Sequence, residues 1–236
     1  MQSRDRLIVA LDRSSRDEIL RIADALHDAA GAFKIGLQAF VSNGPALVRE
    51  LVSRGERIFL DLKIHDIPNT AQNAVAEIAA LGVAMTTVHA AGGEAMLRFS
   101  ARDDLLVLGV TVLTSLDDVE LRRIGFGGNA LDTSVRLARL SKQCGLRGVV
   151  SSPEEIAAIR EACGRDLIIV APGVRPEGAA AGDQRRTTTP AAAIAAGADY
   201  IVVGRPVTGA PAPREAALRI IEQLDAAPHS PTASLA

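Results

Sequence analysis

The sequence predicts a single-domain α/β protein with the architecture of a (β/α)8 TIM barrel. Three observations indicate this fold: short apolar runs recur at regular spacing, helical patterns separate them, and polar residues follow the runs. Most of the runs are continuously apolar, which is typical of parallel strands that are buried on both faces. The eight predicted strands are residues 7–11, 32–35, 57–63, 84–88, 105–113, 147–150, 167–171 and 200–203.

Segments of helical length and composition alternate with these strands. Ser14 or Ser15 is placed to cap the first helix, and Thr189 precedes Pro190, which suits the first turn of the seventh. Gly197 lies where that seventh helix should stop. The predicted helices are residues 15–30, 38–54, 69–81, 93–102, 129–144, 153–163, 190–196 and 212–226.

Eight strand–helix units fit one barrel over residues 1–226, with no domain boundary inside it. A doubly wound open sheet is the alternative, but no Gly-x-Gly-x-x-Gly motif follows the first strand. Residues 227–236 contain two prolines and show no hydrophobic periodicity, so they are predicted to be a disordered tail.

Composition excludes several classes of protein. The net charge is −2, aromatic residues make up 3% of the chain and tryptophan is absent, which argues against nucleic acid or a membrane surface as partner. No apolar window reaches the length of a membrane span, and no targeting segment is visible. Cys144 and Cys163 form no Cys-x-x-Cys pair, so they are predicted to be core residues of a cytoplasmic protein.

Polar residues gather where the predicted strands end, which is the catalytic face of such barrels. Asp12 follows the first strand, Lys34 lies on the second, and Asp61 and Lys63 lie on the third. Alternate residues of a strand share a face, so Asp61 and Lys63 are predicted to point the same way. An incidental ion pair at a solvated strand end is the alternative interpretation. After the fifth strand come Thr114 and Ser115.

The last two units suggest an anion site. Gly204 and Arg205 follow the eighth strand, where backbone N–H groups and a guanidinium can bind phosphate. A plain turn with a surface arginine is the alternative. The loop over residues 172–189 is long enough to act as a lid. It carries Arg175, Gln184 and two further arginines that could meet an anion, Arg185 and Arg186.

The histidines do not predict a metal centre. His65 falls on the opposite face from Lys63 if the strand continues, so a structural or surface role is expected for it. His89 follows the fourth strand, and its role stays open. No group of His, Asp and Glu at metal-ligand spacing converges on the strand ends, so no metal is predicted.

Taken together, the motifs resemble the orotidine 5′-monophosphate decarboxylase family over nearly the whole barrel. The segment from Asp61 to Thr70 is the most specific of them, and the Gly-Arg turn alone would be weak. The motifs that carry the resemblance are Ile8-Val-Ala-Leu-Asp12, Phe33-Lys-Ile-Gly36, Asp61-Leu-Lys-Ile-His-Asp-Ile-Pro-Asn-Thr70, Val112-Leu-Thr-Ser115, Pro172-Gly-Val-Arg175 and Val203-Gly-Arg-Pro206.

The resemblance implies cofactor-independent decarboxylation of orotidine 5′-monophosphate to UMP in de novo pyrimidine biosynthesis. It implies a charged array of Lys34, Asp61, Lys63 and Asp66, in which Lys63 donates a proton to C6 of the pyrimidine. Family enzymes are homodimers with shared sites, so Asp66 would serve the partner's site, as would Ile67 and Thr70.

The resemblance also implies the contacts of the substrate. Asp12 and Lys34 would hold the ribose hydroxyls, and Thr114, with or without Ser115, would meet the pyrimidine. The phosphate would be held by Gln184 and Arg205, with the Gly204 amide and Arg175 close by.

Two other functions stay open. Metal-dependent sugar-phosphate decarboxylases and aldolases of the same superfamily share Asp-x-Lys-x-x-Asp on the third strand. These enzymes resemble one another in using an acidic residue on the second strand for a metal, whereas this chain has Lys34 there. A non-catalytic nucleotide-binding barrel is the second alternative. It would keep Arg205 and Gln184 but would not need all four residues of the charged array.

Overall fold

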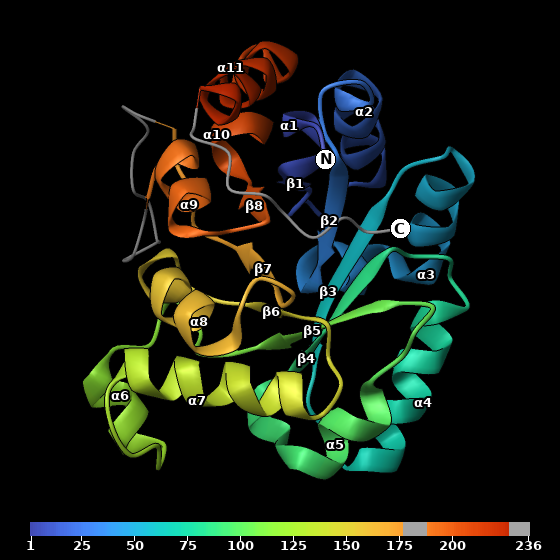
Figure 1. Cartoon of the computed structure of the whole chain (residues 1–236). Helices are drawn as coiled ribbons and strands as arrows, with labels where there is room; N and C mark the ends of the chain where they lie inside the picture. The colour runs from blue at the N-terminus through green and yellow to red at the C-terminus, as the bar shows by residue number, and fades with distance from the viewer. Residues whose placement is uncertain (177–187, 227–236) are drawn as a thin grey trace.

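The computed structural model describes residues 1–176 and 188–226, and its centre is a closed barrel of eight parallel strands. Each strand pairs with its neighbours in sequence, and β1 pairs with β8 to close the barrel (Figure 1). The predicted fold is therefore confirmed. The strands are β1 (Leu7–Ala10), β2 (Ala32–Gly36), β3 (Ile58–Ile64), β4 (Met85–His89), β5 (Leu106–Val110), β6 (Gly148–Val150), β7 (Ile168–Ala171) and β8 (Tyr200–Val203).

Helices surround the barrel and connect successive strands (Figure 1). Two short 3-10 turns, η1 (Ala90–Gly92) and η2 (Pro153–Glu155), precede α5 and α8. The helices are α1 (Ser3–Arg6), α2 (Arg16–Leu26), α3 (Leu37–Ser53), α4 (Pro68–Ala79), α5 (Gly93–Ser100), α6 (Asp118–Arg123), α7 (Ala130–Gln143), α8 (Ile156–Cys163), α9 (Pro190–Ala196), α10 (Arg205–Thr208) and α11 (Pro213–Asp225).

The apolar core has two layers because strand side chains alternate. On β1, Leu7 and Val9 join the cluster between the strands and the helices. Ile8 and Ala10 point the other way, into the cluster that fills the barrel. This alternation places each outward residue against a helix and each inward residue in the barrel interior. Cys144 and Cys163 are buried free thiols, as predicted.

Two predicted helix boundaries are confirmed by hydrogen bonds. Ser15 caps α2 by accepting from the Glu18 N–H, and Thr189 caps α9 by accepting from the Ala192 N–H. Gly197 ends α9 with φ of 112°, a conformation that side chains disfavour.

Other predicted elements differ from the observed ones. The helix predicted over 38–54 is interrupted at Gly44, whose φ is 64°, because the following Pro45 has no N–H to donate. The strand predicted over 105–113 ends at Val110, where the Thr111 hydroxyl turns to Val150 and Ser151 of the neighbouring strand end. The first helix stops at Leu26 rather than at residue 30. Helix α6 was not predicted, and the stretch predicted as helix from residue 153 begins as the 3-10 turn η2.

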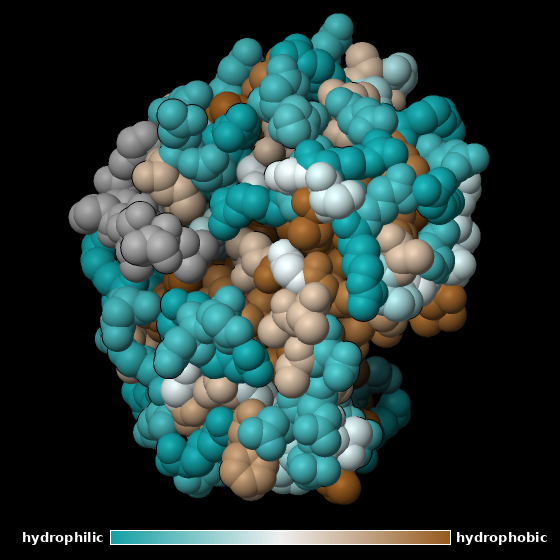
Figure 2. Space-filling view, turned by 90° about the vertical axis from the view of Figure 1, so that its right-hand side faces the viewer, coloured by the Kyte–Doolittle hydropathy of each residue, from teal (hydrophilic) through white to brown (hydrophobic). Residues whose placement is uncertain are grey.

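The side of the molecule that carries α2, α3 and α4 exposes apolar residues. Figure 2 shows hydrophobic atoms in the middle of this face with hydrophilic ones above and below. Leu37 and Val41 of α3 are 54% and 80% exposed, and Ile67, which precedes α4, is 67% exposed. Among the residues described, no helix is both long and apolar enough to span a membrane.

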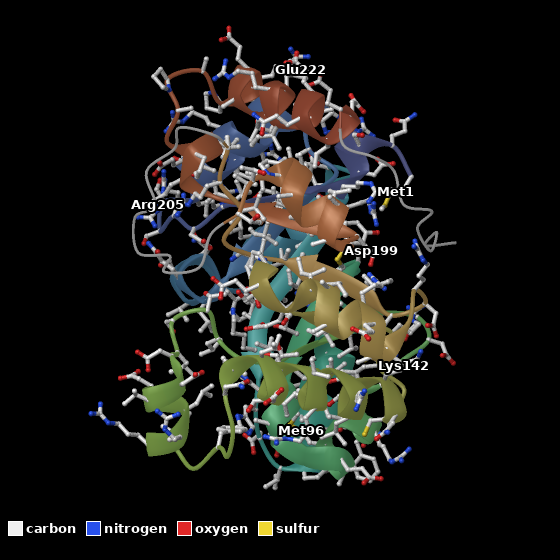
Figure 3. All side chains as sticks on the ribbon, turned by 60° about the vertical axis from the view of Figure 1, so that its left-hand side comes forward. Met1, Met96, Lys142, Asp199, Arg205 and Glu222 are labelled. Carbon is white, nitrogen blue, oxygen red and sulfur yellow. The ribbon has the colours of Figure 1, made fainter. Side chains whose placement is uncertain are left out.

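The two ends of the barrel differ in chemistry. Asp199 precedes β8 and Arg205 follows it, so they lie at opposite ends (Figure 3). Asp199 is buried, and its Oδ2 accepts from Arg160 Nη2 at 2.9 Å and from the Ile169 N–H at 2.8 Å. This ion pair ties α8 to the strands at the end where the strands begin.

Candidate functional site

A cavity of about 730 Å³ opens at the carboxyl ends of the strands. A cavity of this size suits a small organic ligand. The described lining comes from every strand end except that of β4. It consists of Ala10, Asp12, Arg13, Lys34, Gly36, Leu37, Gln38, Asp61, Lys63, Val110, Val112, Leu113, Thr114, Val150, Ser151, Ser152, Pro172, Gly173, Val174, Arg175, Val202, Gly204, Arg205 and Thr208.

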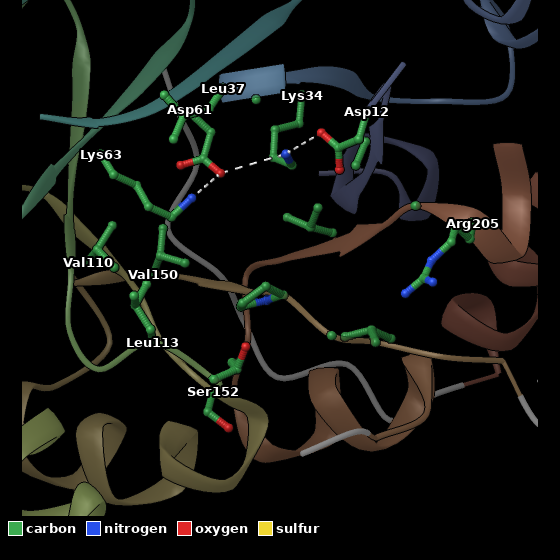
Figure 4. Close-up of a pocket in the computed structure, with 18 of the residues that line it drawn as sticks. Asp12, Lys34, Leu37, Asp61, Lys63, Val110, Leu113, Val150, Ser152 and Arg205 are labelled. Carbon is green, nitrogen blue, oxygen red and sulfur yellow. Dashed lines mark hydrogen bonds and ion pairs between the residues drawn. The ribbon is translucent and has the colours of Figure 1, made fainter. Parts of the chain in front are cut away.

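Four charged side chains form a continuous row along one wall of this cavity (Figure 4). Lys34 Nζ lies 3.0 Å from Asp12 Oδ1 and 3.7 Å from Asp61 Oδ2. Lys63 Nζ donates to the same Asp61 oxygen at 2.8 Å. Charges therefore alternate along the row, and each ammonium faces a carboxylate. The prediction that Asp61 and Lys63 share one face is confirmed by this contact.

The backbone that brings Lys63 to Asp61 departs from a regular strand. Lys63 has φ of 53°, and no other non-glycine residue in the described ranges has a positive φ. The β3–β4 pairing shifts register here, because Leu60 pairs with Thr86 whereas Ile64 pairs with Val88. Strand alternation thus predicted the right contact but not the backbone that makes it. A left-handed conformation at a residue other than glycine is strained and is found most often at functional sites.

Asp61 is held as a carboxylate. Burial by itself would raise the pKa of Asp61, but the ammonium groups of Lys63 and Lys34 outweigh burial and lower it. Hydrogen bonds from Lys63 and from the Thr87 hydroxyl lower the pKa further. The side chain is 11% exposed, so its charge acts in a poorly solvated site, where electrostatic effects are strong.

Gly36 makes room for the first ion pair of the row. A Cβ at this position would lie 2.8 Å from Asp12 Oδ1 and 2.9 Å from Lys34 Nζ. The backbone of Gly36 has φ of −91°, which other residues adopt freely. The site therefore needs glycine at position 36 because it has no side chain, and not because of its backbone conformation.

Two arginines line the far side of the cavity from Lys63. Figure 4 places Arg205 across the cavity from the Lys63 side chain. Burial lowers the pKa of Arg175, and the nearby positive charge of Arg205 lowers it further. Arg175 Nε is buried and has no hydrogen-bond partner among the residues described. Two guanidinium groups that face one cavity make a site suited to an anion.

The base of the long loop is fixed next to these arginines. Val174 forms a β-bridge with Thr188, and the Arg175 N–H donates to the Thr188 carbonyl at 2.9 Å. Gln184, Arg185 and Arg186 lie outside the described residues, so the predicted lid contacts stay predictions.

An apolar wall faces the Lys63 end of the row. Val110 of β5 pairs with Val150 of β6, and both lie beside Lys63 together with Leu113 (Figure 4). Thr114 lines the same cavity, whereas Ser115 lines a neighbouring one with Asp117 and Glu154. The site therefore joins a charged wall to an apolar one, an arrangement that can hold a planar ring beside an ammonium group.

Three predicted residues are not brought into this cavity by their own chain. Asp66, Ile67 and Thr70 are exposed and are not part of the described lining. Asp66 Oδ1 accepts from the Ile67 N–H, which fixes the turn into α4. This chain alone therefore does not assemble the predicted array of Lys34, Asp61, Lys63 and Asp66, and Asp12 contacts Lys34 instead.

His65 and His89 pack against each other beside the array. Their ring centroids are 5.4 Å apart. Burial lowers the pKa of His89, as do the charges of His65 and Lys63, whereas His65 lies exposed. Within the described ranges, no three His, Cys, Asp or Glu side chains come together in a way that would hold a metal ion.

Sequence reasoning missed Thr87, Gly36 and the valine pair of the apolar wall. Thr87 and the valines lie inside continuously apolar or neutral runs, so no charge marks them. Gly36 could have been identified from its position two residues after Lys34 on the same strand. Residues at that spacing share a face, so the absence of a side chain at Gly36 leaves space beside the lysine.

The fold and the site define a (β/α)8-barrel enzyme in which aspartates and lysines alternate along one wall and two arginines line another. The chain belongs to the Orotidine 5'-phosphate decarboxylase / HUMPS family, whose model matches residues 5–220. The predicted family resemblance is therefore confirmed, and with it the class of carbon–carbon lyases.

Individual proteins agree with this assignment. The orotidine 5′-phosphate decarboxylase of Heliobacterium modesticaldum is 49% identical over 236 residues, which cover 95% of this chain and 97% of that protein. That of Moorella thermoacetica is 47% identical and covers 95% of this chain and 94% of its own. The crystal structure of the Lactobacillus acidophilus enzyme superposes with a TM-score of 0.83 at 35% identity, over 93% of this chain and 99% of that one.

Proposed function

We propose that this protein decarboxylates orotidine 5′-monophosphate to UMP, in de novo pyrimidine biosynthesis and without a cofactor. The observation that carries the proposal is the row of Lys34, Asp61 and Lys63 in one cavity with Arg175 and Arg205. The row supplies charge for the reacting end of the substrate, and the arginines supply charge for the phosphate.

In the proposed complex the nucleotide lies across the cavity, with its phosphate at the arginines and its base at Lys63. Arg205 and Arg175 bind the phosphate together with the Gly204 amide, and Gln184 adds a contact from the long loop. Asp12 and Lys34 bind the ribose hydroxyls between the two ends. The pyrimidine then meets Thr114 and the apolar wall, with C6 beside Lys63. Phosphate binding far from the reacting carbon supplies energy that can be used in the transition state.

The residue types suit the chemistry. The bond from C6 to the carboxylate breaks, CO2 leaves, and the electron pair stays on C6. The Lys63 ammonium stabilises that charge as it develops and then donates its proton to C6, and solvent returns a proton to the amine. Asp61 faces the substrate carboxylate. Two like charges ~4 Å apart repel by about 4 kcal/mol at an effective dielectric constant near 20, and this repulsion is relieved as CO2 departs.

A homodimer with shared sites completes the array in this proposal. Asp66, Ile67 and Thr70 are exposed and are not among the described residues that line the cavity of their own chain, which suits a contribution to the partner's site. The apolar residues Leu37, Val41 and Ile67 are exposed on the α3–α4 side of the molecule (Figure 2), where a second subunit would bury them. A cytoplasmic location is part of the same proposal, and the two free buried cysteines support it.

A direct assay tests the proposal. The purified protein is given orotidine 5′-monophosphate in EDTA, and the fall in pyrimidine absorbance is followed. We expect turnover that the chelator does not change. Binding without turnover would instead indicate a nucleotide-binding barrel. Loss of activity in EDTA with recovery on adding a divalent cation would indicate a metal-dependent enzyme. The lysine at position 34 argues against that result, because metal-dependent enzymes of this superfamily resemble one another in having an acidic residue there.

A further inference from the structure

Thr87 lies beneath the charged row, on β4. It is 0% exposed. Its hydroxyl accepts from the Lys63 N–H at 2.9 Å and donates to Asp61 Oδ1 at 2.9 Å. A hydroxyl has one proton to donate and lone pairs to accept, so this one side chain serves both residues at once.

The irregular pairing of β3 explains why Lys63 uses this hydroxyl. Between the pairs Leu60–Thr86 and Ile64–Val88, β3 has three residues where β4 has only Thr87. The Lys63 N–H points to the Thr87 side chain at that gap, at the residue whose φ is 53°. A partly buried N–H that loses its partner is costly, so the hydroxyl stabilises the conformation that aims Lys63 at Asp61.

We propose that Thr87 is a positioning residue for decarboxylation, which orients the Asp61 carboxylate and holds the Lys63 backbone so that its amine meets C6. This inference rests on the proposed function. Thr87 itself touches neither the cavity nor the substrate, since it is not among the described lining residues. It acts on Lys63 through the backbone and on Asp61 through the side chain.

Thr86 offers a matched comparison on the same strand. It is also 0% exposed, and its hydroxyl donates to the Leu60 carbonyl at 2.8 Å. Thr86 therefore bonds to the backbone one residue before the charged row and contacts neither Asp61 nor Lys63 through its hydroxyl. Replacing either threonine with valine removes one buried hydroxyl at constant shape.

The test compares Thr87→Val, Thr86→Val and Thr87→Ser for kcat, KM and UMP affinity. For Thr87→Val we expect kcat to fall about ten- to hundredfold, because a hydrogen bond to a charged group is lost. KM and UMP affinity should stay within about twofold of wild type, because the phosphate and ribose contacts lie elsewhere. Thr86→Val should keep kcat within about threefold, and Thr87→Ser should restore most of it, since serine keeps the hydroxyl.

The pH profile is a readout that a purely structural role would not move. The Thr87 hydrogen bond helps to lower the pKa of Asp61, so the acidic limb of kcat/KM in Thr87→Val should shift to higher pH. The titratable groups that face Asp61 are Lys63 on its own strand, Lys34 on β2 and His89 on β4. All three remain in both valine variants, so a shift confined to Thr87→Val reports on the hydroxyl.

The outcomes separate this inference from the proposed function. A wild-type protein that does not turn over orotidine 5′-monophosphate refutes the function. An active wild type with Thr87→Val as active as Thr86→Val, and with an unshifted acidic limb, refutes the inference alone. If Thr87→Val fails to fold, Thr87→Cys replaces it. Cysteine is close to serine in size, but its thiol is a weak hydrogen-bond donor and acceptor. Equal kcat for the cysteine and serine variants then refutes the inference.

Discussion

Lys63 contacts Asp61 from a left-handed backbone: its φ is 53°, and its Nζ lies 2.8 Å from Asp61 Oδ2. Such strain costs on the order of 1–3 kcal/mol and persists only when the surroundings favour it. Here the surroundings are the Asp61 carboxylate and the Thr87 hydroxyl. The fold therefore holds one lysine in an unfavourable conformation at the point where the proposed reaction requires an ammonium group.

Removing the amine should abolish the reaction but not the binding of product. We expect Lys63→Ala to lower kcat at least about 10³-fold, since both charge stabilisation and proton donation are lost. UMP should still bind with near wild-type affinity in calorimetry, because the arginines and Asp12 are intact. Lys142→Ala is the control, as Lys142 pairs with Asp166 far from Arg205 (Figure 3) and its loss should leave kcat unchanged. A near-normal kcat in Lys63→Ala contradicts the assigned role.

Mixing two inactive variants tests the shared site. In a heterodimer of Lys63→Ala and Asp66→Ala subunits, one of the two sites has both residues intact. An equimolar mixture that exchanges freely should recover activity in about one quarter of its sites. Replacing the Asp66→Ala subunit with the double variant Lys63→Ala/Asp66→Ala gives no intact site and should recover nothing. If exchange is demonstrated and the first mixture stays inactive, Asp66 does not serve the partner.

Gly36→Ala should disturb ligand binding rather than folding. The new methyl group would displace the Asp12 and Lys34 tips, which lie 2.8 and 2.9 Å from its position. We expect KM to rise about tenfold, because one charge-assisted contact to the ribose is weakened, with little change in Tm. Gly127→Ala is the control, since a Cβ there meets nothing within 4 Å. Wild-type KM in Gly36→Ala would show that the Asp12–Lys34 pair tolerates displacement.

The ion pair at the other end of the barrel should matter for stability and not for catalysis. Arg160→Met removes the guanidinium that is hydrogen-bonded to the buried Asp199 carboxylate, so we expect the free energy of unfolding to fall by about 3–5 kcal/mol in urea titrations. Burial already raises the pKa of Asp199, so its folded-state pKa lies above the unfolded value. Arg160 lowers that pKa, so its removal raises the folded-state pKa of Asp199 further. The loss should therefore be full above the folded-state pKa of the variant and should shrink as the pH falls and Asp199 takes up a proton.

The control for this variant is Arg214→Met, which breaks an exposed pair with Asp28. It should cause no measurable loss of stability, because solvent screens exposed charges. Equal stability of Arg160→Met and Arg214→Met would show that the Asp199 pair contributes nothing. The kcat of folded Arg160→Met should match that of wild type.

Some of the site could be predicted because a parallel barrel collects strand ends on one face. Four charged residues lie at or near the ends of apolar runs: Asp12, Lys34, Asp61 and Lys63. Recognising the runs as successive strands of one barrel was enough to predict that these residues lie together. Arg175 and Arg205 follow the same rule after β7 and β8. Asp66 does not, because the chain has already turned towards α4 when it reaches that residue.

By itself the sequence determined the barrel, the face on which the chemistry lies, and the charged residues on it, because the apolar period and the strand ends are local properties of the chain. The tertiary structure alone decided how those residues meet. The left-handed Lys63, the Thr87 hydroxyl beneath it and the space left by Gly36 depend on contacts between different strands. Those contacts depend on strand register and side-chain packing, which are properties of several strands together and cannot be read from any single segment.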